Sequence, residues 1–247
     1  MRTAFLSDIH ANREAFEAVL DAVERVGVDR IVILGDVVGY GPDPEHAVET
    51  AAALVDRGAV CLLGNHDEAV LSGPRGMSEN ARIAVNWTRG RLERAHLDFL
   101  AGLPLTHEDD GALHVHASAD EPARWHYVDN CPAAARSLSA TSARLVVCGH
   151  THLPAIFYAR PGATPTHFRP LDDKPAPLLS VLRHVVVVGS VGQPRDGNPA
   201  ACFGLLDTQE RAFTMMRAPY DAERTARKIE AAGDLPKWLA MRLLVGR

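Results

Sequence analysis

Three short apolar runs, separated by two patterns typical of amphipathic helices, open the chain and restrict its fold more than any other feature. The runs cover residues 3–6, 30–34 and 59–63, and the helices are expected over 13–26 and 45–56. Asn12 is a suitable N-cap for the first helix, and Gly27 is expected to end it. Buried strands that alternate with helices form parallel sheets with right-handed crossovers, so we predict an α/β protein.

The rest of the chain divides into a helical part and a strand-rich part. Residues 68–102 are predicted to be mostly helical and to lie over one end of the sheet. From residue 103 onward, short strand-like runs predict a second sheet with antiparallel character, interrupted by one helix over 132–139. Two helices, over 220–232 and 236–244, close the chain. We therefore expect a single domain over 1–247 with a mainly helical insertion at about 68–102.

Charge and hydropathy exclude some classes of partner. The chain of 247 residues carries a net charge of −5 and has no block of like charges. This argues against a long nucleic acid held on a broad basic surface, because phosphate binding depends on clustered Lys and Arg. No run approaches the ~18 apolar residues of a membrane span, and the N-terminus lacks the pattern of a signal peptide. We expect a cytoplasmic protein without a membrane partner.

Polar side chains follow five of the strand-like runs. They are Asp8 and His10, Asp36, Asn65 and His66, His116, and His150 and His152. The carboxyl ends of strands are where open α/β sheets place their ligand chemistry. Asp8 and His10 stand two residues apart, as do His150 and His152, so an extended backbone directs each pair to one side. Mixed Asp, His and Asn sites suit Mn, Fe or Zn, and the five clusters together predict a metal centre.

At these positions the chain resembles the calcineurin-like metallophosphoesterases. The matching motifs are Asp8-Ile9-His10, Gly35-Asp36, Gly64-Asn65-His66-Asp67, His116 and Gly149-His150-Thr151-His152, in the order of the family. The segment from Gly189 to Gly197 is similar to the small prokaryotic branch that includes YfcE-like phosphodiesterases and phosphatases. The resemblance implies an α/β fold that is a four-layer α-β-β-α sandwich of two mixed sheets.

The resemblance also implies a site with two divalent metal ions. One ion would be held by Asp8, His10, Asp36 and His152, and the other by Asp36, Asn65, His116 and His150. Mn²⁺ or Fe is expected, while Zn²⁺, Ni²⁺ and Mg²⁺ stay open. A bridging hydroxide would attack phosphorus, His66 would assist the leaving group, and Asp67 is the candidate partner that orients His66.

One departure from the family concerns the ligand His116. The chain has His116-Ala117-Ser118 where the family has His-Gly-Ser, and the extra methyl group is expected to leave the ligand in place. His114 lies on the same face of this strand. We choose His116 as the ligand because it lies nearer the strand end and aligns with the motif, and we interpret His114 as a structural residue or one that supports the ligands without binding the metal.

Substrate recognition is less defined by the sequence. Asn12, Tyr40 and Arg195 are candidates, although Tyr40 could instead pack its loop and Arg195 could belong to a turn. The expected function is the hydrolysis of phosphoric mono- or diesters, with a small phosphorylated substrate as partner. The alternatives are a dinucleoside polyphosphate hydrolase using the same chemistry and a non-catalytic metal-bound binding protein. Whether the protein forms a homo-oligomer stays open.

Overall fold

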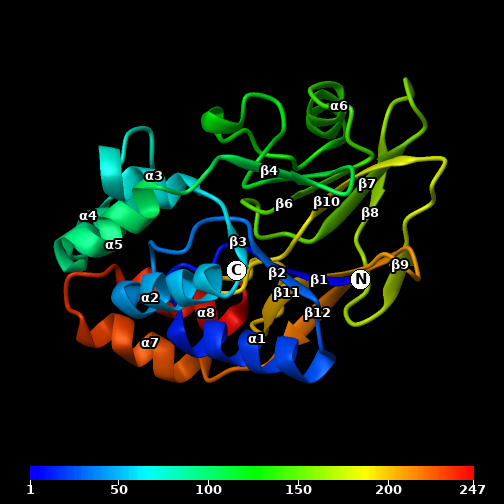
Figure 1. The fold of residues 1–247 in the computed structure, drawn as a ribbon. Coiled ribbons are helices and arrows are strands. Elements are labelled where there is room, and N and C mark those ends of the chain that lie inside the picture. Colours follow the sequence, from blue (N-terminus) through cyan, green and yellow to red (C-terminus); the bar gives the residue numbers. More distant parts are fainter.

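The computed structural model describes residues 1–247 and contains two six-stranded sheets packed face to face (Figure 1). The first sheet has the order β3-β2-β1-β11-β12-β9, and the second has the order β4-β5-β6-β10-β7-β8. Each sheet contains both parallel and antiparallel pairs. With helices on both outer faces, this is the predicted four-layer α-β-β-α sandwich (Figure 1).

The opening segment folds as predicted. Its parallel strands are β1 (Arg2–Leu6), β2 (Arg30–Ile33) and β3 (Val60–Cys61), connected by α1 (Arg13–Val26) and α2 (Pro44–Asp56). The helix α1 begins where the sequence indicates, because the side chain of Asn12 accepts a hydrogen bond of 3.1 Å from the main-chain N of Ala15. It ends at Gly27, whose φ is 70°.

The later strands divide between the two sheets, which corrects the expectation that they form only a second sheet. The second sheet consists of β4 (Thr106–Asp109), β5 (Ala112–Val115), β6 (Leu145–Cys148), β7 (Ala155–Ala159), β8 (Thr166–Phe168) and β10 (Arg183–Val187). Two further strands, β11 (Ala201–Asp207) and β12 (Ala212–Ala218), return to the first sheet, where β11 pairs antiparallel with β1. The short β9 (Pro175–Pro177), which was not predicted, extends the edge beyond β12.

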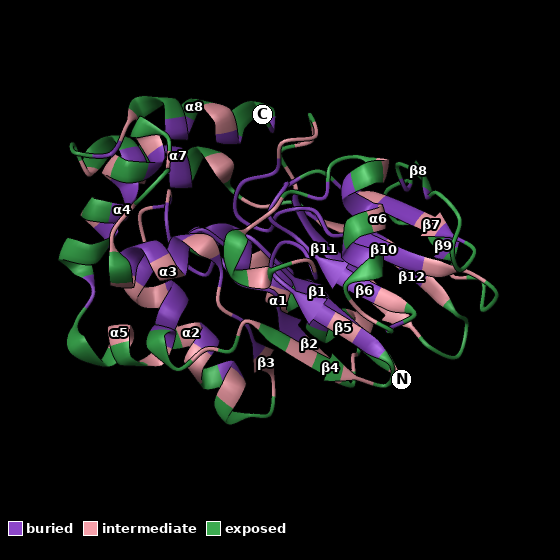
Figure 2. Cartoon of the chain, turned by 90° about the horizontal axis from the view of Figure 1, so that it is seen from above, coloured by how far each residue is buried: buried purple, intermediate pink, exposed green.

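A dry layer of apolar side chains joins the two sheets. Fully buried members from the two sheets are Phe5, Val32 and Leu34, and Val147, Ile156 and Val186. Burial of each such side chain contributes about 1.5–3 kcal/mol. The helix α6 (Cys131–Ser139) covers the outer face of the second sheet, while α1 covers that of the first (Figure 2).

The helices between β3 and β4 lie at one end of the sandwich. They are α3 (Asn65–Ser72), α4 (Glu79–Arg91) and α5 (Arg94–Ala101), so the first of them begins at Asn65 and not at Glu68 as expected. The chain closes with α7 (Ala222–Ala231) and α8 (Lys237–Val245). A small apolar cluster connects α4 with the two C-terminal helices. It contains Ala84 of α4 and Ala226, Ile229, Leu239 and Leu243.

The helical segment therefore packs against the C-terminal helices. Its description as an insertion within one domain stays a prediction. None of the helices has the length and apolar character needed to span a bilayer.

Candidate metal centre

The seven side chains predicted as metal ligands come together at the carboxyl ends of β1, β2, β3, β5 and β6. Six of them, together with His66, form three overlapping groups of potential ligand atoms, and within each group all these atoms lie within 4.8 Å of one another. The groups are Asp8, His10 and His152; His10, Asp36 and His66; and Asp36, His116 and His150. The seventh residue, Asn65, joins through its Oδ1 atom, which lies 3.1 Å from Nε2 of His116.

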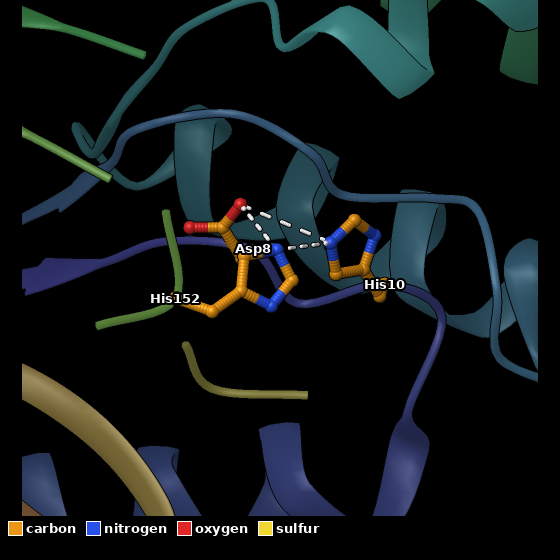
Figure 3. Close-up of side chains that lie close together, drawn as sticks. All are labelled: Asp8, His10 and His152. Atoms are coloured by element: carbon orange, nitrogen blue, oxygen red, sulfur yellow. Dashed lines mark hydrogen bonds and ion pairs between the residues drawn. The ribbon is translucent and has the colours of Figure 1, made fainter. Parts of the chain in front are cut away.

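In the first group, hydrogen-bond acceptors face one another. His10 Nδ1 donates to the carbonyl oxygen of Val38 at 3.1 Å, and His152 Nδ1 donates to that of Gln193 at 2.7 Å. Since each neutral imidazole has one N–H, both Nε2 atoms carry lone pairs, and these atoms lie only 3.2 Å apart. Asp8 Oδ1 lies 3.2 Å from His152 Nε2 and 3.8 Å from His10 Nε2 (Figure 3).

Such a cluster lacks a positive charge. Asp8 Oδ1 is buried and has no hydrogen-bond partner. Buried polar atoms are almost always paired, and a buried charge is paired or coordinates a metal. One carboxylate and two imidazole lone pairs that converge in a buried space therefore fit a divalent cation of the Mn, Fe or Zn type.

The third group, Asp36, His116 and His150, contains the other carboxylate of the centre. His116 Nδ1 donates to the carbonyl oxygen of Leu34 at 3.0 Å, which turns Nε2 toward Asp36 Oδ2 at 3.4 Å. The same Oδ2 atom lies 3.7 Å from His10 Nε2. The other oxygen of Asp36 accepts a hydrogen bond of 2.8 Å from the main-chain N of His66. Asp36 thus lies between the two groups, where a carboxylate can be shared by two ions.

The backbone at this site adopts an unusual conformation. Five of the candidate ligands have φ angles between 51° and 67°, the left-handed region; they are Asp8, His10, Asp36, His150 and His152. This conformation costs roughly 1–2 kcal/mol for a residue with a Cβ atom. Strained residues cluster at functional sites, where the surrounding structure holds them in place. The concentration of five such residues at three strand ends supports a functional role for this part of the molecule.

The pKa values of the site are shifted by burial and by the charges of neighbouring carboxylates and imidazoles. Burial alone would raise the pKa of Asp36, but His116 and the other imidazoles nearby lower it below the ordinary value. Burial would lower the pKa of His116, yet the Asp36 carboxylate raises it to about 9. By contrast, burial lowers the pKa of His66 to about 4 and that of His150 to about 3, so both imidazoles are neutral near pH 7.

Two glycines of the motifs are required by close packing beside the ligands. A Cβ atom at Gly64 would collide with the main-chain N and Oδ1 atoms of Asp36. A Cβ atom at Gly149 would collide with Oγ of Ser7. These glycines allow the strand ends to approach closely enough for the ligand groups to meet.

Asp67 has a different role from the one predicted for it. Its buried carboxylate accepts hydrogen bonds from the main-chain N atoms of Val37, Val38 and Gly64, at 3.3, 3.0 and 3.0 Å. It thereby connects the loop that carries Asp36 to the start of α3. His66 is not its partner, since Nδ1 of His66 is buried and forms no hydrogen bond. The His66 ring is held by packing against the ring of Tyr40, and the two ring centroids lie 4.4 Å apart.

The three predicted substrate residues separate into two kinds. Tyr40 and Arg195 line a cavity of about 940 Å³ that also contacts Asn65, His66 and His150. Asn12 does not line this cavity, and its side chain is buried within the protein. Besides capping α1, its amide donates to the carbonyl oxygen of Gly192 at 2.7 Å. The geometry therefore assigns Asn12 to the support of the loops and not to substrate contact.

Two residues of the cavity, Tyr127 and Arg242, were not predicted. The ring of Tyr127 stacks on that of His150 at a centroid distance of 4.1 Å. Trp125 donates from Nε1 to a carboxylate oxygen of Glu68 at 2.8 Å and closes another part of the wall. Arg242 of α8 also lines the cavity. The irregular loop before α6 and the C-terminal helix have no local sequence signal that would place them here.

Comparisons with known proteins agree with this geometry. The model of the calcineurin-like phosphoesterase superfamily domain matches residues 1–211. The chain is 32% identical over 259 residues to the uncharacterized protein MJ0912 of Methanocaldococcus jannaschii, which covers 99% of this chain and 98% of that protein. It is 30% identical over 214 residues to the phosphodiesterase YfcE of Escherichia coli, covering 84% of this chain and 88% of YfcE.

Among solved structures, the crystal structure of a metallophosphoesterase from Sphaerobacter thermophilus matches with a TM-score of 0.86 and 36% identity. The match covers 100% of this chain and 99% of that chain. The fold, the clustered ligand groups and the matched residues lead to one assignment. The chain belongs to the calcineurin-like phosphoesterase superfamily.

Proposed function

We propose that the protein hydrolyses phosphoric esters with two divalent metal ions. The observation that carries this proposal is the convergence of acceptors in the buried cluster, where Asp8 Oδ1 and the Nε2 atoms of His10 and His152 meet with no donor between them. The family normally uses a dinuclear metal site, and this donor set fits one. We propose Mn²⁺ or Fe, since these ions accept both carboxylate and imidazole ligands.

The ligands divide between the two ions around Asp36. Asp8, His10 and His152 would hold one ion, and Asn65, His116 and His150 would hold the other. Asp36 would contact both, which its position between the groups supports. His66 also lies near His10 and Asp36. We assign it to the substrate, as the resemblance to the family implies, and its place in the cavity wall is compatible with that role.

When bound, the metal ions would supply Lewis acidity and lower the pKa of water, so that hydroxide is available as the nucleophile near neutral pH. The protein supplies the rest of the proposed mechanism. His66, neutral near pH 7, donates a hydrogen bond to the leaving oxygen or the phosphoryl group from the cavity wall. Tyr40 packs against His66 and limits its movement. Arg195 adds a positive charge to the same cavity for an anionic substrate.

The test is turnover of p-nitrophenyl phosphate and bis-p-nitrophenyl phosphate by metal-depleted protein to which Mn²⁺ is returned. We expect hydrolysis of at least one ester with Mn²⁺ and none without it. Protein that binds two ions per chain but hydrolyses neither ester would favour the alternative, a non-catalytic metal-bound binding protein. The ratio of the two rates decides between monoester and diester preference.

A small phosphorylated substrate fits this site better than a long nucleic acid. The net charge of −5 provides no broad basic surface. The location in the cytoplasm stays a prediction from the sequence.

A further inference from the structure

Two arginines of the cavity wall share one neutral acceptor. Arg195, in the loop after β10, donates from Nη2 to Oε1 of Gln193 at 2.9 Å. Arg242, from α8, donates from Nη1 to the same oxygen, also at 2.9 Å. An amide oxygen carries no net charge, so this shared contact does not neutralise the two positive charges.

The remaining contacts of the pair also lack an acidic side chain. Arg242 donates from Nε to the main-chain oxygen of Arg247, the last residue of the sequence, where a free chain end is a carboxylate, and its guanidinium lies 4.1 Å from the ring centroid of Trp238. The guanidinium of Arg195 lies 5.9 Å from the ring centroid of Tyr40, and its Nε atom is buried without a hydrogen-bond partner.

Arg217 is an arginine of this protein that has acidic partners. Its guanidinium forms ion pairs with the carboxylates of Asp172 and Asp196. The Arg195–Arg242 pair has no such partner. Burial, and then the charge of Arg195, lower the pKa of Arg242 to about 10, so the pair is repulsive as it stands. An anion bound between the two guanidinium groups would remove this repulsion.

The pair lies directly beside the proposed metal centre. The main-chain oxygen of Gln193 accepts the hydrogen bond that orients the ligand His152. The same short segment continues to Arg195, whose main-chain N donates to the carbonyl oxygen of His152 at 3.4 Å. Arg195, Arg242 and the metal-centre residue His150 also line one continuous cavity.

We propose that Arg195 and Arg242 form a binding site for a second phosphate group, next to the one that reacts at the metal ions. This inference rests on the proposed function. It narrows the substrate class to compounds with neighbouring phosphates, such as a nucleoside polyphosphate or a short inorganic polyphosphate. The cavity of about 940 Å³ leaves room for more than a single phosphate.

The binding test uses metal-depleted protein, so that only the protein's own residues act on the ligand. Isothermal titration calorimetry measures the affinity for pyrophosphate and for adenosine 5′-diphosphate. We expect Arg242→Gln to weaken binding of both by at least about tenfold, since a hydrogen bond to a charged group is lost. Lys237→Gln is the matched control: it removes one exposed positive charge from the same helix, outside the cavity, and is expected to leave the affinity unchanged.

Arg242→Lys keeps the positive charge and is expected to recover part of the affinity, which guards against a folding defect in the Gln variant. Equal pyrophosphate affinity in wild type and Arg242→Gln would overturn the inference, as would an equal loss in Lys237→Gln. These outcomes are separate from the proposed function, which depends on turnover of p-nitrophenyl esters. Comparison of the two affinities identifies the kind of ligand. Tighter binding of adenosine 5′-diphosphate than of pyrophosphate indicates a nucleoside polyphosphate, and equal affinities indicate an inorganic polyphosphate.

Discussion

The buried carboxylate of Asp67 provides a sharp test of how the metal loop is held. It accepts hydrogen bonds from three main-chain N–H groups, two of them in the loop that follows Asp36. The substitution Asp67→Ala leaves these donors without a partner, at a cost of about 1–3 kcal/mol each. Burial and the charge of Asp36 raise the pKa of Asp67 to about 7, so repulsion offsets part of this stabilisation. We therefore expect a net loss of about 2–5 kcal/mol.

The assay is thermal unfolding of metal-free protein, which excludes the effect of metal binding on the melting temperature. For a chain of this size, a loss of 1 kcal/mol lowers Tm by about 2–4 °C, so Asp67→Ala should lower Tm by at least about 4 °C. Asp67→Asn keeps one acceptor oxygen and should lose less. The control Asp98→Ala removes an exposed i,i+4 ion pair with Arg94 and should change stability by at most ~0.5 kcal/mol. On the scale of about 2–4 °C per kcal/mol, a Tm within about 2 °C of wild type means a loss of at most about 1 kcal/mol. Such a result for Asp67→Ala would refute this account of the loop.

Three further predictions concern the centre itself. His66→Ala should keep both metal ions in elemental analysis but hydrolyse p-nitrophenyl phosphate about 10²–10⁴-fold more slowly, and a full rate would remove His66 from the mechanism. Gly64→Ala should lower metal content and activity because its Cβ collides with Asp36, whereas Gly90→Ala, in open space on α4, should stabilise the protein by about 0.5–1 kcal/mol. Mn²⁺ at a concentration of about 1,000 Kd should stabilise the wild type by about 4 kcal/mol, measured as a higher Tm, and an unchanged Tm would mean that the ion does not bind the folded state.

Much of the fold was predictable because local signals and tertiary packing agree. Asn12 and Gly27 lie at the two ends of α1 as expected, since each satisfies backbone groups at a helix end. The predicted ligands lie together for a topological reason: within each sheet the carboxyl ends of neighbouring parallel strands meet at one edge, and the two sheets pack face to face with these edges at the same end. The residues on which this rests, such as Asp8 and Asp36, directly follow apolar runs in the sequence.

Other features depend on contacts between distant segments and could not be predicted. The sequence of β11 is typical of a strand but does not specify its partner, β1 of the first sheet. The strand β9 consists of Pro-Ala-Pro, which has little strand propensity and pairs only because the edge of β12 is available. Asp67 stands beside His66 in sequence, yet its hydrogen bonds go to a loop some thirty residues away. Arg242 reaches the cavity only through the packing of α8.

The central claim is that Asp36 is shared by two metal ions that the reaction requires. The most direct test measures metal per chain by inductively coupled plasma mass spectrometry after Mn²⁺ loading, together with p-nitrophenyl ester turnover. We expect two ions and activity in the wild type, and the same in the surface control Asp56→Asn. In Asp36→Asn we expect at most one ion and no turnover. A wild type that binds a single ion, or an Asp36→Asn variant that keeps two ions and full activity, would contradict the claim.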